Sequence, residues 1–244
     1  CQVGCGMGCT FCASGRYGMK RNLSAGEILS QALFIARDKR ERGGVNKIVM
    51  MGSGEPLANY DNTLKFIRLI NAPYGLNIGM RSISVSTCGL AERIIALAND
   101  GISCTLSLSL HAATDEKRKK IMRIAEQYSV KQLIDALKAY FDKTGRRVIL
   151  EYILIDGFND TASDAAALKA LLNGLCCHVN LIPLNATEYC DLKPPTKKKA
   201  YAFCEKLKAL GVSASVRRSM GSDVAGACGQ LKNRTAELKN AKTE

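Results

Sequence analysis

The amino-acid sequence predicts an α/β fold in which strands alternate with helices around a mainly parallel sheet. Short apolar runs of strand length are separated by amphipathic stretches with helical spacing, and short loops, many with glycine, join them. No internal repeat, low-complexity tract or long linker interrupts this alternation over 244 residues, which favours a single domain. Ligands of such folds bind at the carboxyl ends of the strands, so functional residues are expected directly after each strand.

The elements follow from local signals. Ser24 and Glu27 form a capping box that begins a helix over residues 24–44, and Gly43 with Gly44 is expected to end it. The apolar run at residues 46–51 stops at the glycine turn "GSGEP", which suits a buried strand. By the same criteria, further strands are expected at 81–89, 103–111, 147–155, 177–184 and 212–218. Further helices are expected at 61–70, 90–101, 114–127, 129–145, 161–175 and 197–211.

Composition narrows the class of protein. No apolar run reaches the length of a membrane span and no signal peptide is visible, which predicts a cytoplasmic protein without membrane attachment. The eleven cysteines are then reduced thiols or metal ligands rather than a disulfide framework. A net charge of +13 indicates either a polyanionic partner or a lysine-rich, solvated surface, and charge alone leaves both open.

Three cysteines near the start carry the strongest motif. Cys5, Cys9 and Cys12 have the spacing C-x-x-x-C-x-x-C on a loop rich in glycine, and can wrap around one soft metal centre. Structural zinc normally takes four ligands, and no second C-x-x-C follows. Three ligands without an evident fourth predict a [4Fe–4S] cluster with one iron left open, the pattern of radical S-adenosylmethionine enzymes. A zinc site or three unconnected buried cysteines are the alternatives.

Segments along nearly the whole chain extend this similarity. They are "QVGCGMGCTFCASG", "RNLSAGEI", "MMGSGEPLANYDN", "SVSTCGL", "SLSLHAATDEKRKKIM", "EYILIDGFND", "HVNLIPLN" and "VRRSMGSD…ACGQL". Together they resemble the radical S-adenosylmethionine adenine methyltransferases of large ribosomal RNA, above all the branch that makes 2-methyladenosine in 23S rRNA and some tRNAs. A related antibiotic-resistance branch methylates adenosine C8. The resemblance implies a partial (β/α)6 barrel, with the methyltransferase core at residues 1–230 and a charged tail at 231–244.

The resemblance also implies a set of site residues. Cys5, Cys9 and Cys12 would hold the cluster, whose open iron binds S-adenosylmethionine. Gly54 and Glu55 would contact the methionine moiety, where a carboxylate suits the ligand's ammonium group. Taken alone, Glu55 could equally be a capping residue of a strand-to-helix turn. The remaining cofactor contacts implied are Ser86, Ser109, Leu110, His111 and Asn185. His111 is assigned contact only, and His178 is interpreted as structural.

Cys228 is the second chemical centre that the resemblance implies. In the family this cysteine carries a methyl group from one S-adenosylmethionine, and a radical from a second converts it into the group that adds to adenine. Such chemistry requires an electron donor such as flavodoxin or ferredoxin. The remaining cysteines are interpreted as structural: Cys88, Cys104, Cys176, Cys177, Cys190 and Cys204.

Some family features are expected upstream of Cys1. These are the resolving cysteine, the glutamate general base, the first barrel strand and an N-terminal helical RNA-binding region, and Cys1 is not given the resolving role. Basic segments at residues 117–123, 196–199, 216–218 and 232–234 fit contact with 23S rRNA or tRNA. The alternatives are a C8 methyltransferase, an RNA-binding module with a structural iron–sulfur or zinc site, and a chain that is inactive without the upstream region.

Overall fold

The computed structural model describes residues 1–16, 18–39, 41, 43–185 and 190–218. Within them, six parallel strands form one sheet whose spatial order is the chain order. These strands are β3 (Ile48–Met50), β4 (Ile83–Thr87), β5 (Thr105–Ser109), β6 (Val148–Leu154), β7 (Cys177–Pro183) and β8 (Ala214–Val216). All six strands expected from the sequence are present, and the α/β fold with a parallel sheet is confirmed.

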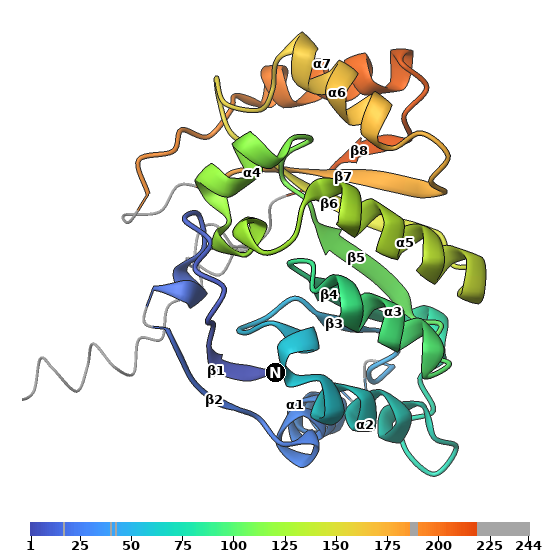
Figure 1. The fold of residues 1–244 in the computed structure, drawn as a ribbon. Helices are drawn as coiled ribbons and strands as arrows, with labels where there is room; N and C mark the ends of the chain where they lie inside the picture. Colours follow the sequence, from blue (N-terminus) through green and yellow to red (C-terminus); the bar gives the residue numbers. More distant parts are fainter. Residues whose placement is uncertain (17, 40, 42, 186–189, 219–244) are drawn as a thin grey trace, which may run out of the picture.

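Helices link the strands, as parallel pairing requires, because each connection must return to the sheet's amino end. The helices are α1 (Ala25–Asp38), α2 (Tyr60–Asn71), α3 (Ala91–Asn99), α4 (Asp115–Ile121), α5 (Val130–Thr144), α6 (Ala162–Leu171) and α7 (Lys197–Ala209). In Figure 1 the strands follow one another from β3 in the lower half to β8 near the top.

The core lies between the sheet and its helices. Leu106, Leu108 and Leu150 in the central strands are completely buried, as are Leu133 and Leu137 on α5. A near-continuous apolar strand is typical of a parallel sheet covered by helices. The packing of the helices therefore holds the sheet rigidly, and residues at the carboxyl ends of its strands are held in fixed positions.

The capping boxes expected from the sequence are formed. Ser24 accepts a hydrogen bond from the Glu27 backbone N–H while the Glu27 carboxylate accepts one from Ser24 N, and Ser129 and Gln132 repeat the arrangement on α5. Each box satisfies two backbone donors that a helix start leaves without partners. Local sequence thus sets where these helices begin.

Two helices end earlier than the sequence predicts. The first ends at Asp38 and not at the Gly43–Gly44 pair, since residues 38–42 offer no apolar side chain that could pack another turn. The expected helix at 114–127 is broken at Met122, which is extended (φ −137°, ψ 109°) and separates α4 from a 3-10 turn at Arg123–Glu126. Met122 is buried, so burial of its side chain takes precedence over continuation of the helix.

An antiparallel ribbon near the start of the chain was not expected. β1 (Gln2–Gly4) pairs with β2 (Met19–Asn22), and the pairing closes the cysteine-bearing loop at its base. In Figure 1 the ribbon lies to the left of the sheet, on the side toward which the strands' carboxyl ends point. It therefore holds the loop over the edge where ligands of parallel sheets bind.

The sheet is open. Among the described residues β3 and β8 pair with one neighbour each and not with one another, which is the topology of a partial barrel. Curvature nevertheless brings their carboxyl ends together, because Arg217 after β8 donates through Nη1 to the sulfur of Met51 after β3 at 3.6 Å. Both side chains face the same cavity.

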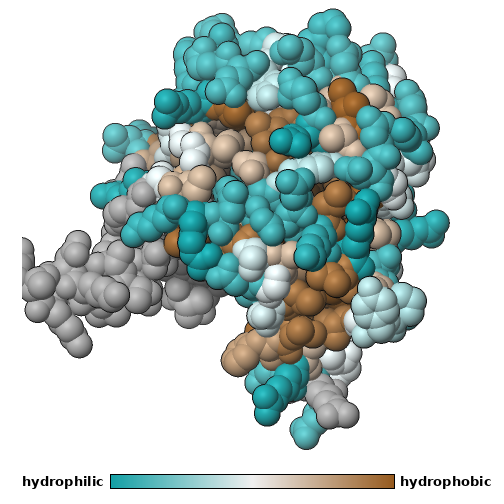
Figure 2. Space-filling model, turned by 60° about the horizontal axis from the view of Figure 1, so that its bottom comes forward, coloured by the Kyte–Doolittle hydropathy of each residue, from teal (hydrophilic) through white to brown (hydrophobic). Residues whose placement is uncertain are grey.

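Part of the molecular surface, formed by helix α1 and the edge strand β3, is apolar. Leu33, Phe34 and Ile35 on α1 are 45%, 73% and 47% exposed, and Val49 on the edge strand β3 is 59% exposed. Figure 2 shows apolar surface gathered on this lower side of the molecule. No helix within the described ranges is long and apolar enough to cross a membrane.

Candidate functional site

The loop between β1 and β2 is held against the "GSGEP" turn by close backbone packing. Gln2 Oε1 accepts a hydrogen bond from the Glu55 backbone N–H at 2.8 Å, and Gln2 N donates to Ser53 O at 3.3 Å. Gly54 has φ +98°, and a Cβ there would lie 2.5 Å from Gln2 Cβ. Glycine at residue 54 is therefore required both by its backbone conformation and by the approach of the loop.

The three cysteines of the motif line one cavity. Cys5, Cys9 and Cys12 are free thiols, and all three border the cavity at the carboxyl ends of the strands. Burial and, to a smaller extent, the neighbouring Cys12 and Cys5 raise the pKa of Cys9 to about 12. Burial likewise raises the pKa of Cys5. Thiols that are buried together in this way are poor anions by themselves, and a bound cation is what favours their thiolate form.

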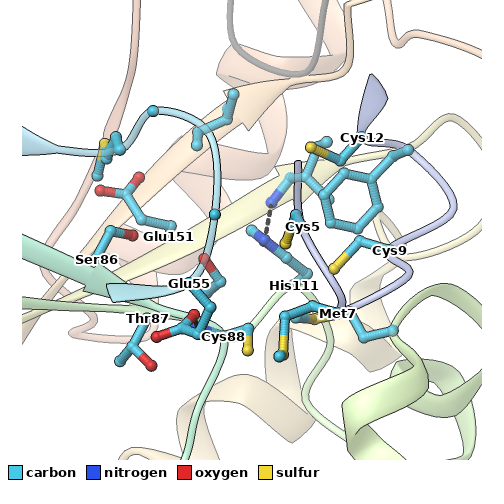
Figure 3. A pocket seen from close by; sticks show the side chains of 18 of the residues that line it. Cys5, Met7, Cys9, Cys12, Glu55, Ser86, Thr87, Cys88, His111 and Glu151 are labelled. Carbon is cyan, nitrogen blue, oxygen red and sulfur yellow. Dashed lines mark hydrogen bonds between the residues drawn. The ribbon is translucent and has the colours of Figure 1, made fainter. Parts of the chain in front are cut away.

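Polar residues from the strand ends complete the cavity. Gly54, Glu55, Ser86, Ser109 and His111, which the resemblance implied as cofactor contacts, all line it. Figure 3 shows Cys5, Cys9 and Cys12 on one side of the cavity, Glu55 and Ser86 on the other, and His111 between them. Two further predicted contacts do not line it: Leu110 is completely buried in the core, and Asn185 is half-buried.

Glu55 has a structural role in addition to its place in the cavity. Its carboxylate accepts hydrogen bonds from Leu57 N at 3.0 Å and from Cys88 N at 2.7 Å. The first bond caps the 3-10 turn Pro56–Asn59, and the second ties that turn to the end of β4. Burial raises the pKa of Glu55, while these two donors oppose the rise. The capping interpretation of Glu55 is therefore correct, and the same carboxylate borders the cavity.

His111 is held rigidly at the end of β5. Its φ of +62° is in the left-handed region, and its Nδ1 accepts the Ile153 backbone N–H at 3.1 Å. Burial lowers its pKa to about 3, with the positive charge of Arg118 contributing, so the ring is neutral at physiological pH. Because Nδ1 accepts, the proton is assigned to Nε2, which makes that nitrogen a donor. The Phe11 ring meets His111 edge-on at 4.9 Å, which joins the cysteine loop to the sheet.

The cavity also contains residues that the sequence analysis did not single out. Glu151 in β6 lines it, is buried, and accepts a hydrogen bond from Asn180 Nδ2 at 2.7 Å. Burial raises its pKa, while Asn180 and the nearby Arg217 lower it. A charged residue inside the apolar run "RVILEYILI" was the signal that could have revealed it. Cys88, interpreted as structural, also lines the cavity and is buried.

Other sequence-based assignments have different outcomes. Cys228 and the basic segment at 232–234 lie outside the described residues. Cys104 and Cys204 are buried in the core, in keeping with a structural role. His178 lies away from the cavity, with its ring nitrogens 2.9 and 2.7 Å from the hydroxyls of Ser213 and Ser215.

The donor set fits an iron–sulfur cluster. Three thiols converge on one cavity, and thiolates are the ligands of such clusters. In the described part of the chain, no three His, Cys, Asp or Glu side chains are gathered around a point that could hold a metal ion. A four-iron cluster takes one thiolate per iron, so its ligands surround a volume and do not meet at one ion. Three thiolates thus leave one of the four irons without a protein ligand.

Comparison with known proteins agrees with this geometry. Residues 1–169 match the model of the Radical SAM superfamily. A protein of Clostridium perfringens (strain 13 / Type A) named "Probable dual-specificity RNA methyltransferase RlmN" is 53% identical over 241 residues, which are 99% of this chain and 69% of that protein. A second relative of that name, from Clostridium acetobutylicum, is 47% identical over 99% of the chain and 69% of its own length.

Solved structures share the fold. A radical SAM methyltransferase from Sphaerobacter thermophilus superposes with a TM-score of 0.92 at 46% identity, over 95% of this chain and 68% of that one. Streptococcus suis SuiB, whose structure is bound to S-adenosylmethionine, has a TM-score of 0.65 at 16% identity and shares the fold alone. The sequence, the cavity and these relatives agree that the chain belongs to the radical SAM superfamily and, within it, to the RlmN family of RNA methyltransferases, which use a [4Fe–4S] cluster and S-adenosylmethionine.

Proposed function

We propose that the protein methylates C2 of an adenosine in 23S rRNA and in tRNA, by way of a methyl group carried on Cys228. The relatives' name describes dual specificity toward RNA. The observation that carries the proposal is the shared cavity, in which the three motif cysteines face Glu55, Ser86, Ser109 and His111. An adenine carbon is a weak nucleophile, so radical chemistry is the suitable route to its methylation.

Cys5, Cys9 and Cys12 are proposed as the cluster ligands. When bound, the cluster supplies the electron that cleaves S-adenosylmethionine to a 5′-deoxyadenosyl radical, after reduction by a donor such as flavodoxin or ferredoxin. The chain's own contribution is to hold the three thiols on a loop whose base is fixed by β1 and β2. The loop is also fixed farther along, where Thr10 N donates to Ile121 O at 3.1 Å at the end of α4.

The strand ends are proposed to orient the S-adenosylmethionine. The negative charge of the Glu55 carboxylate attracts the ligand's ammonium group, and Gly54 lines the cavity beside it. Ser86, Ser109 and the Nε2–H of His111 offer hydrogen bonds to its polar groups. Leu110 contributes through its position between Ser109 and His111, and Asn185 lies just beyond β7.

Cys228 is proposed as the methyl carrier. Its thiolate displaces S-adenosylhomocysteine from one S-adenosylmethionine and gains the methyl group. The deoxyadenosyl radical from a second S-adenosylmethionine then takes a hydrogen atom from that methyl group, and the resulting carbon radical adds to adenine C2. Product release requires removal of the C2 proton and cleavage of the carbon–sulfur bond, as the resolving cysteine implied by the resemblance forms a disulfide with Cys228. The released methylene carbon takes up a proton, and the remaining electron passes to the oxidised cluster. This order of steps needs two successive S-adenosylmethionine molecules for each methyl group transferred.

Mass spectrometry of nucleosides tests the proposal. After reaction of the anaerobically reconstituted protein with a 23S rRNA fragment or tRNA, digestion is expected to yield 2-methyladenosine. An 8-methyladenosine product would contradict the proposed position. Cys228→Ala is expected to abolish methylation while the iron content stays at the wild-type level. Cys176→Ala, which removes an exposed thiol, is the matched control and is expected to retain activity.

A further inference from the structure

Arg118 on α4 is a buried cation of unusual setting. Its side chain is completely buried, and it donates to three backbone carbonyl oxygens at the ends of β4 and β5. Nε donates to Leu110 O at 3.1 Å, and Nη2 donates to Cys88 O and to Ser109 O. Nη1 is buried and has no hydrogen-bond partner among the described residues. The carbonyl groups thus fix the guanidinium while one of its nitrogens stays unsatisfied.

Within the described residues no carboxylate forms an ion pair with this charge. The ionisable groups that oppose the effect of burial on Arg118 are the Cys88 and Cys9 thiols and the Asp115 carboxylate. Asp115 Oδ1 accepts the backbone N–H of Val130 at 2.7 Å, so this carboxylate is occupied at the start of α5. An unpaired buried charge is costly, and burial lowers the pKa of Arg118 accordingly. The fold therefore leaves a positive charge that needs a counter-charge.

The cysteine loop is fixed to the same helix. Ile121, three residues after Arg118, accepts hydrogen bonds from the backbone N–H and the hydroxyl of Thr10 at 3.1 and 3.4 Å. Cys9 packs on the apolar cluster that contains Cys88, Ile121 and Met122. Cys88, whose carbonyl oxygen accepts a hydrogen bond from Arg118 Nη2, lines the same cavity as Cys9. Helix α4 thus places its buried cation beside a proposed cluster ligand.

We propose that Arg118 is the buried counter-charge of the iron–sulfur cluster and a positioning residue that makes reduction of the cluster easier. The three thiolates carry more negative charge than the oxidised four-iron core carries positive charge, so the cluster with its ligands is negative. One-electron reduction makes it more negative still. A fixed cation nearby stabilises the reduced form more than the oxidised form, since cluster potentials respond to charge and hydrogen bonding around the sulfurs. The electron comes from the donor protein, and Arg118 exchanges neither electrons nor protons. This inference rests on the proposed assignment of Cys9 to the cluster.

The midpoint potential of the cluster tests the role of the charge. Arg118→Met removes the charge, and Arg118→Lys keeps it while losing the forked hydrogen bonds. In anaerobic redox titrations followed by electron paramagnetic resonance without RNA, the Met variant is expected to titrate at a more negative potential than wild type. The Lys variant is expected to stay near wild type. Equal potentials for the Met variant and wild type would overturn the proposal.

Arg146 provides the matched control. It too has a buried nitrogen, Nε, without a hydrogen-bond partner among the described residues, and its Nη2 donates to Thr105 Oγ1 at 3.4 Å. It lies at the amino ends of β5 and β6, away from the cysteine loop. Arg146→Met is therefore expected to leave the potential unchanged, and an equal shift in both Met variants would contradict a local effect of Arg118.

Thermal unfolding distinguishes two roles of Arg118. One is to compensate the charge of the cluster, and the other, called the clamp below, is only to hold the ends of β4 and β5 through its hydrogen bonds to carbonyl oxygens. If Arg118 compensates the cluster, loading with iron and sulfide raises the Tm of wild type more than that of Arg118→Met. A Met variant that folds but binds less iron than the Lys variant supports the same conclusion. If Arg118→Met lowers the Tm relative to wild type by the same amount with and without the cluster, Arg118 acts as the clamp alone. The same conclusion follows if the Met variant does not fold without the cluster. Full iron retention in Cys9→Ala would instead contradict the ligand assignment.

Discussion

The side chain of Gln2 and the backbone of Glu55, 53 residues apart, are joined by a hydrogen bond of 2.8 Å between Oε1 and N. This contact fixes the first residues of the cysteine loop to the turn that carries the buried carboxylate. The loop and the turn can approach this closely only because residue 54 has no side chain.

Gly54→Ala is expected to destabilise the protein and loosen the cysteine loop. The left-handed backbone alone costs an alanine about 1–2 kcal/mol, and the clash with Gln2 adds to this cost. Gly157→Ala is the matched control, because Gly157 has φ +70° but open space around a Cβ. Urea unfolding is expected to show a larger loss for Gly54→Ala, and equal losses would contradict the importance of the contact.

Single substitutions of the three motif cysteines are expected to abolish cluster binding. Cys5→Ala, Cys9→Ala and Cys12→Ala each remove one of three thiolates that share a cavity, and two thiolates hold a four-iron cluster poorly. Iron and sulfide content after anaerobic reconstitution measures the effect. Cys88→Ala is the sharpest control, since Cys88 lines the same cavity outside the motif; iron loss in that variant would show that the ligand set differs.

Acid is expected to destabilise the protein through His111. Its pKa is lowered to about 3 in the folded state, so between about pH 6.5 and 3 the unfolded state binds more protons than the folded state. The free energy of unfolding therefore falls as the pH falls through this window, by up to about 1.4 kcal/mol per pH unit from this one group.

Urea unfolding at several pH values measures this effect. His111→Asn, which tolerates the left-handed backbone, is expected to show a shallower pH dependence than wild type. His178 is only half-buried and its pKa is also lowered, so His178→Asn is expected to change the slope less. If the free energy of unfolding of His111→Asn depends on pH as steeply as that of wild type, protonation of His111 is not the cause of the acid destabilisation.

RNA affinity is expected to depend on the exposed part of the 117–123 segment. Lys119, Lys120 and Arg123 are exposed, whereas Arg118 is buried and Lys117 is bound to Asp164 at 2.6 Å. Replacement of the three exposed residues by alanine is expected to weaken binding and to reduce the slope of log affinity against log salt by up to about 2. The control replaces Lys131, Lys143 and Lys169, which are exposed on helices α5 and α6. Equal losses in both triple variants would indicate nonspecific attraction alone.

The sequence predicted elements whose signals are local. A capping box shows which side chains bind the free backbone N–H groups at a helix start, so the starts of α1 and α5 were found from it. A short apolar run indicates a buried strand, and the six strands of the sheet were found from such runs. The ribbon of β1 and β2 was missed because its strands have three and four residues, and all residues of β2 are exposed. Such a ribbon depends on contacts with the rest of the molecule and leaves no hydrophobic period.

The resemblance implied Glu55, Ser86 and His111 as cofactor contacts, and the fold class independently placed ligands at the strand ends where these residues line the cavity. Glu151 and Cys88 were missed because their importance comes from the cavity that neighbouring strands form together. Arg118 was also misjudged from the sequence, where it is one of five basic residues in a short segment that was expected to contact RNA. Only the packing of α4 against the strand ends shows that it is buried.

The open sheet has a consequence for the size of what can be modified. A base that remains attached to a long polymer cannot be threaded through a closed ring of strands, but it can be inserted sideways where two edges stay unpaired. Here, among the described residues, β3 and β8 share no backbone pairing, and Arg217 Nη1 donates to the Met51 sulfur between them. The incomplete ring therefore leaves one side of the described sheet without strand pairing, so a base on a long RNA does not have to pass through a closed barrel.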